Sequence, residues 1–127
     1  MSLNPEKGYE LIIETRDGYL YASVMAERSD LQMAVGVADA LNEALATTTL
    51  RSVLLVRKGP LVADSYYINL ATLFFRNALP KGVRIAFVYD ADIGKYERKL
   101  LTNAYSEAKL DAGVFGSEQE AVEWLLC

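Results

Sequence analysis

The feature that most constrains the fold is an apolar segment, residues 52–56, which reads Ser-Val-Leu-Leu-Val between Arg51 and Arg57. A strand with one face in water alternates apolar and polar side chains, whereas an unbroken apolar run is typical of a strand covered on both faces. Such strands occur in parallel sheets with helices packed against them. Residues 83–89 and 112–115 are further strand-type segments. The chain is therefore expected to be an α/β protein.

Two alternating segments precede this strand. Apolar and polar side chains take turns along residues 9–15 and again along residues 19–25, with Asp17-Gly18 between them. A period of two predicts strands. Because Asp-Gly supplies the positive φ angles of a tight turn, the chain is expected to open with an antiparallel hairpin.

Between the other strands lie segments whose apolar residues recur at helical spacing. The expected helices start at a capping box of Ser29 and Gln32, at Asp64 or Ser65, at about residue 93 after Asp92 as cap, and at a capping box of Ser117 and Glu120. Phe74 and Tyr96 are expected on inward faces. The predicted order is ββαβαβαβα: a mixed, mostly parallel five-stranded sheet with helices packed on it. We expect one domain, residues 1–127, with an ordered core of about 8–126.

Composition excludes several kinds of chemistry. The chain has 127 residues, no histidine and one cysteine, Cys127. Histidine-based triads, histidine metal ligands, zinc sites and internal disulfides are therefore excluded. The net charge of −4 argues against nucleic-acid binding, and no segment is typical of a signal peptide or a membrane span. We expect a cytoplasmic protein that is not an enzyme and has no metal or other cofactor.

Polar residues follow the parallel strands at their carboxyl ends, where open α/β sheets bind ligands. Gly59, Asp64, Asp90 and Asp92 are expected at this edge and form a candidate surface for a partner or a ligand. The three carboxylates among them, those of Asp64, Asp90 and Asp92, could hold Mg²⁺. The same residues could instead cap helices or form turns. Ser65 is a candidate phosphoacceptor at a helix N-terminus, with helix capping as the alternative.

Aromatic residues cluster on and beside the second helix. Tyr66 and Tyr67 belong to the candidate surface, and Phe74 and Phe75 follow two turns later. Core packing is the ordinary explanation of such a stripe. A stripe too wide for one face would instead line a ligand pocket or a homodimer interface.

Three stretches resemble the STAS domain, named for sulfate transporters and anti-sigma-factor antagonists, and above all its short stand-alone bacterial members. They are the Asp-Gly hairpin, the strand leading through a loop to Asp64-Ser65, and the ending 114–125 with its strand, capped helix and Trp124-Leu125. The resemblance covers about residues 9–126. A receiver domain is a rival for the same pattern, but it would need an aspartate where Arg57 stands.

The resemblance implies a protein partner. In family antagonists a serine that follows an aspartate at this helix start is phosphorylated by an anti-sigma kinase, and Asp64-Ser65 matches that pair. The family continues with a small residue and glycine, whereas this chain has Tyr66-Tyr67, whose rings would alter the surface that a kinase docks on. The first hypothesis is thus a protein-interaction or regulatory module. The alternative is a small-ligand binding domain, for a nucleotide or an apolar molecule, the latter as in the related Sec14-like fold.

Overall fold

The computed structural model describes residues 8–27, 29–60, 64–90 and 93–127. The strands are β1 (Glu10–Arg16), β2 (Tyr19–Met25), β3 (Ser52–Lys58), β4 (Arg84–Tyr89) and β5 (Ala112–Phe115). The helices are α1 (Leu31–Ala46), α2 (Ser65–Ala78), α3 (Lys95–Ala108) and α4 (Glu118–Leu125). The predicted order is confirmed. A helix with the length and apolarity needed to cross a membrane does not occur in the described part of the chain.

One sheet joins the five strands in the order β1-β2-β3-β4-β5. β1 and β2 are antiparallel, with Glu10 opposite Met25 and Arg16 opposite Tyr19, and all later pairs are parallel. Gly18 in the hairpin turn has φ +88°, a conformation that glycine adopts without strain. The mixed sheet with its opening hairpin is therefore as predicted.

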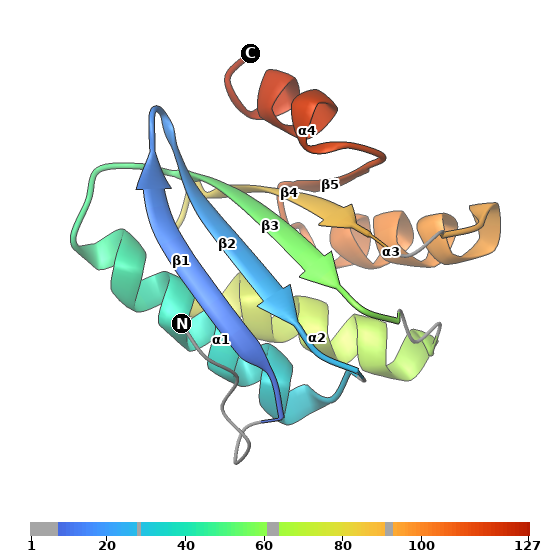
Figure 1. Ribbon diagram of the computed structural model, residues 1–127. Helices are drawn as coiled ribbons and strands as arrows, with labels where there is room; N and C mark the ends of the chain where they lie inside the picture. The colour runs from blue at the N-terminus through green and yellow to red at the C-terminus, as the bar shows by residue number, and fades with distance from the viewer. Residues whose placement is uncertain (1–7, 28, 61–63, 91–92) are drawn as a thin grey trace.

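The helices cover the two faces of the sheet unequally. α1, α2 and α3 lie side by side against one face, and α4 alone packs on the other, over β3, β4 and β5 (Figure 1). Because the parallel strands follow one another in sequence order and their connections share one hand, the three connecting helices fall on the same face.

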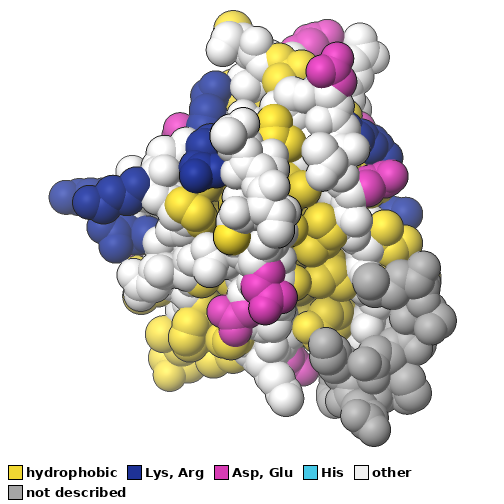
Figure 2. Space-filling model, turned by 90° about the vertical axis from the view of Figure 1, so that its left-hand side faces the viewer, with side chains coloured by type: hydrophobic (Ala, Val, Ile, Leu, Met, Phe, Trp, Pro, Cys, Tyr) yellow, Lys and Arg dark blue, Asp and Glu magenta, His cyan; other side chains and the backbone are white. Residues whose placement is uncertain are grey.

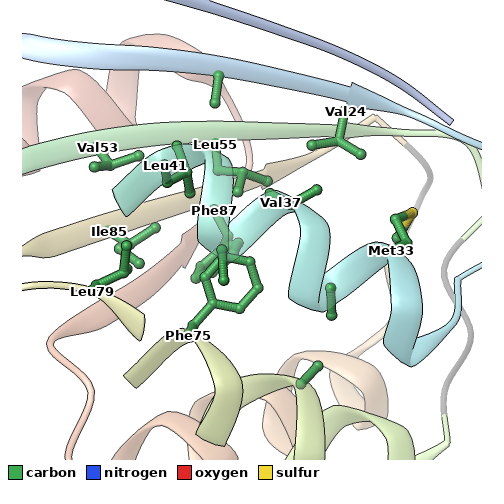
Figure 3. Close-up of a cluster of buried hydrophobic side chains, with 14 of the residues drawn as sticks. Val24, Met33, Val37, Leu41, Val53, Leu55, Phe75, Leu79, Ile85 and Phe87 are labelled. Carbon is green, nitrogen blue, oxygen red and sulfur yellow. The ribbon is translucent and has the colours of Figure 1, made fainter. Parts of the chain in front are cut away.

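The main core lies between the sheet and this layer of three helices. Figure 3 shows side chains of β2, β3 and β4 meeting those of α1 and α2. The rings of Phe75 and Phe87 meet edge to face with centroids 6.0 Å apart, and Tyr105 of α3 stacks on Phe87 at 5.2 Å. Phe87 thus ties both α2 and α3 to β4.

An arginine of β4 helps to hold α4 on the opposite face. The Arg84 guanidinium lies 3.8 Å above the ring of Trp124 and donates to the carbonyl oxygen of Trp124 at 3.1 Å. Ala121 and Leu125 are the buried residues of α4. Ser117 caps α4 as predicted, because its hydroxyl accepts the N–H of Glu120.

β1 forms one edge of the sheet. Leu11 and Ile13 pack, partly buried, against the main core, and hydrophobic atoms reach the surface as a band on this side of the molecule (Figure 2). Glu10, Glu14 and Arg16 alternate with them, and Glu14 pairs with Arg16 at 3.0 Å. Charges along an open edge hinder pairing with a strand of another chain.

The predicted cap of α1 is wrong. Asp30, not Ser29, precedes the first helical residue, and its carboxylate accepts the N–H of Met33 at 2.8 Å. Ser29 stands one residue too early to reach that group. Its hydroxyl instead accepts a hydrogen bond from the Arg57 guanidinium at 3.0 Å.

The start and the inward face of α3 also differ from the prediction. The helix begins at Lys95 after Gly94, whose N–H donates to the Glu97 carboxylate at 2.8 Å. Asp92, the predicted cap, lies outside the described residues. Tyr96 is 65 % exposed and was wrongly expected inside. The ring of Tyr96 lies in the first turn of α3 and is exposed to solvent. The tyrosine of this helix that is buried is Tyr105.

Candidate functional site

Two of the predicted edge residues contact one another. Gly59 follows β3 and Asp90 follows β4, and the Gly59 N–H donates to the Asp90 carboxylate at 2.9 Å. The Asp90 N–H donates in turn to the carbonyl oxygen of Arg57 at 3.1 Å. Asp90 therefore closes the turn beyond two adjacent strands, which is the structural alternative to a ligand-binding role.

Asp64 caps α2. Its carboxylate accepts the N–H groups of Tyr66 at 2.9 Å and of Tyr67 at 3.5 Å. Ser65 is the first helical residue and is exposed, so its hydroxyl is accessible. In the part of the chain that the structure describes, no three acidic or other metal-ligating side chains gather into a cation site. The described carboxylates at this edge bind backbone N–H groups instead.

The aromatic residues of α2 divide between two sides of the helix. Tyr66, Leu73 and Phe74 are exposed by 71 %, 44 % and 40 %, and we call these three residues the outer face of α2. Tyr67 is half-buried and Phe75 is buried. Phe74 was predicted to be buried, and this is wrong: the inward side of α2 is centred on Ile68, Ala71, Thr72 and Phe75.

A cavity of about 80 Å³ lies on the inward side, between the ends of β2–β4 and helices α1–α3. Most of its lining is apolar, but Ser29, Thr72 and four larger polar side chains also line it. The larger four are Arg57, Tyr67, Tyr89 and Tyr105, which we call the buried polar cluster. The residues predicted to hold a small ligand, Gly59, Asp64 and Asp90, are not among those that line it.

Arg57 is the most unusual member of this cluster. Its side chain is only 5 % exposed. The guanidinium donates to the carbonyl oxygens of Ala26 at 3.0 Å, of Pro60 at 3.4 Å and of Lys58, and to the Ser29 hydroxyl at 3.0 Å. Burial lowers the pKa of Arg57, partly offset by the neighbouring Tyr67. The residue stays charged at neutral pH because an arginine pKa begins far above 7.

The tyrosines of the cluster hold their protons tightly. Burial raises the pKa of Tyr89 to about 12 and raises that of Tyr105 well above its usual range, where the nearby Tyr89 adds to the effect. Burial also raises the pKa of Tyr67, against the opposing influence of Ser29 and Arg57. All three hydroxyls are therefore neutral hydrogen-bond donors at physiological pH.

These shifts predict loss of stability in alkali. Above pH 10 the tyrosines of the unfolded chain ionise while Tyr89 and Tyr105 in the folded chain do not, so stability falls as the pH rises from 10 to 12. Tyr89 alone is expected to account for about 2–3 kcal/mol of the free energy of unfolding. Urea unfolding between pH 8 and pH 12 measures this loss. Tyr89→Phe should flatten the curve, and a variant whose curve overlays the native one would contradict the assignment.

Sequence reasoning missed Arg57, Tyr89 and Tyr105. The apolar run predicts that the strand stops before Arg57, but β3 continues through it to Lys58. The acceptors of its guanidinium include Ala26, which lies 31 positions away in the chain. A local sequence pattern cannot reveal a contact between residues so far apart in the chain. The one indication in the sequence was a charged residue next to a buried strand.

The comparisons with known proteins agree with this architecture. Neither a family model nor a curated protein matches the chain. Among solved structures, it is similar to the crystal structure of an anti-sigma factor antagonist from Mycobacterium paratuberculosis, with a TM-score of 0.64 and 14 % identity. The match covers 99 % of this chain and 100 % of that one. The chain therefore has the fold of an anti-sigma factor antagonist, as the resemblance of its sequence to STAS domains predicted.

Proposed function

We propose that this chain is a non-enzymatic regulatory module, one domain over residues 1–127, that binds another protein through the outer face of α2. The observation that carries the proposal is the exposure of Tyr66, Leu73 and Phe74, three large apolar side chains on one side of a single helix. Grouped aromatic side chains at a surface are typical of protein-binding sites. The fold likeness to an anti-sigma factor antagonist supports the same role.

Ser65 is the proposed regulatory position. It is exposed at the start of α2, next to Tyr66 and about two turns before Leu73 and Phe74. A phosphate on Ser65 would place two negative charges beside the Asp64 carboxylate and compete with it for the N–H of Tyr66. Phosphorylation would therefore alter the surface that the partner contacts. The partner class we propose is an anti-sigma-type kinase in the bacterial cytoplasm.

A paired substitution tests the surface. We expect Tyr66→Ser with Phe74→Ser to weaken partner binding at least tenfold, because buried aromatic side chains dominate interface energies. The control is Tyr96→Ser, which removes an equally exposed ring from α3. A partner captured from the native cells is identified by mass spectrometry, purified, and titrated by calorimetry against each variant. Ser65→Asp should also weaken binding.

Several outcomes would contradict the proposal. Unchanged affinity of the double variant would remove the outer face of α2 from the interface, and unchanged affinity of Ser65→Asp would remove the switch. A concentration-dependent dimer in light scattering, lost in the double variant, would assign the outer face to a homodimer. Turnover of a metabolite by the purified chain, abolished by changing Asp64 or Asp90, would make the protein an enzyme.

A further inference from the structure

The cavity beneath the sheet has one chemically distinctive side. Apolar side chains from α1, α2 and α3 form most of its wall, among them Met33, Val37, Ile68 and Leu101. The buried polar cluster completes the wall near the carboxyl ends of β3 and β4. A mostly apolar wall with a few convergent polar groups is the usual composition of a small-molecule site.

The hydroxyl of Tyr105 is the first sign that this wall is built for a ligand. Tyr105 is 4 % exposed, and within the described residues its hydroxyl is the buried side-chain atom without a partner at normal hydrogen-bond geometry, although the Tyr89 hydroxyl lies close enough to act on its pKa. An unpaired buried hydroxyl is unfavourable, and native proteins keep few of them. Because Tyr105 also lines the cavity, an acceptor atom placed there would satisfy its hydroxyl.

Arg57 defines the charge of that acceptor. Its four N–H bonds to carbonyl and hydroxyl oxygens fix the guanidinium, but none of these oxygens is negatively charged. Among the described residues the ion pairs are Arg16 with Glu14 and Arg84 with Asp111. Burial lowers the pKa of Arg57, and Asp90 lies close enough to offset part of this, but the Asp90 carboxylate accepts the Gly59 N–H and forms no ion pair with the guanidinium. A buried cation without a directly paired anion favours a further negatively charged group nearby. The tyrosine hydroxyls supply donors to an anion, and Arg57 supplies the compensating charge.

The volume limits the size of the ligand. About 80 Å³ is well below the several hundred Å³ of an ordinary drug-sized pocket, so a nucleotide would not be enclosed by it. A cavity of about 150 Å³ accommodates benzene. By that measure about 80 Å³ accommodates roughly three to five non-hydrogen atoms. A short aliphatic chain with one carboxylate has this size.

We infer that the cavity is a binding site for a short-chain monocarboxylate, whose carboxylate accepts a hydrogen bond from Tyr105 in the field of Arg57. The alkyl end of the ligand lies against the apolar wall near Ile68 and Leu101. The inference does not rest on the proposed protein partner, because the outer face of α2 and the cavity lie on opposite sides of that helix.

Nuclear magnetic resonance of methyl groups tests the inference with acetate and propionate at pH 7 and constant ionic strength. We expect saturable shifts of the Ile68 and Leu101 methyl signals with dissociation constants on the order of 1 mM. Leu54, which belongs to the small core under α4, reports on non-specific effects. Propionamide has the same shape as propionate without its charge and should bind at least tenfold more weakly.

Tyr105→Phe is the decisive variant, because it removes one unpaired hydroxyl and leaves the packed ring in place. It should fold at least as stably as the native chain and bind propionate about tenfold more weakly. Tyr96→Phe, the exposed counterpart, should bind normally. Absence of saturable shifts, equal binding of propionamide, or equal binding by Tyr105→Phe would each overturn the inference.

Discussion

Gly59→Ala is expected to lower the free energy of unfolding by about 4 kcal/mol. Gly59 has φ +107°, a region that costs a side-chain-bearing residue about 1–2 kcal/mol. An added Cβ would also overlap the carbonyl oxygen of Ala26, a backbone atom that cannot swing aside. Ala26 is itself fixed, because its N–H donates to Lys58 at 3.2 Å and its carbonyl accepts from Arg57. Such overpacking adds about 1–3 kcal/mol.

Gly82→Ala is the matched control. Gly82 has φ +84°, but no atom lies within 4 Å of an added Cβ. This variant should therefore lose only the conformational part, about 1 kcal/mol. Urea unfolding of both variants, followed by circular dichroism, gives the difference. Equal losses would show that the loop after β3 relaxes freely and that the contact between Gly59 and Ala26 does not constrain it.

Phe87→Ala is expected to cost about 4 kcal/mol, within the range for removing a buried ring from a core. Phe87 contacts rings from two helices, Phe75 edge to face and Tyr105 stacked, so the space it leaves cannot close by movement of one neighbour. Its removal also joins new volume to the existing cavity, which Phe87 lines. The unfolding midpoint in urea should fall with little change in slope.

Phe74→Ala makes the same chemical change on the outer face of α2. Because the ring is 40 % exposed, the expected loss is below about 1 kcal/mol. If Phe74→Ala proves as destabilising as Phe87→Ala, the inward side of α2 has been assigned to the wrong residues. A normally folded Phe74→Ala chain is also the appropriate material for measuring partner binding.

The kinds and order of the elements could be predicted from the sequence because each depends on local periodicity. The apolar run of β3 and the alternation in the hairpin leave little choice of conformation. The direction in which α2 faces could not be predicted so closely, since apolar residues surround most of that helix. A shift of one residue exchanges Phe74 for Phe75, and tertiary packing against the sheet decides between them.

The candidate site was harder to predict for a topological reason. Ligand crevices at the carboxyl edge of α/β sheets form where the strand order reverses. In this sheet the order runs from β1 to β5 without reversal, so no such crevice is expected beside Gly59 and Asp90. The cavity lies instead beneath the sheet, where side chains of three helices and three strands leave space between them.

The unreversed strand order also affects how the molecule is made. Each strand hydrogen-bonds to the strand that precedes it in the chain, so a nascent polypeptide can add β3 to a finished hairpin, then β4, then β5. No strand has to be inserted between two others already paired. Each closure then spans one connecting helix, which costs less chain entropy than pairing strands that lie farther apart in the sequence.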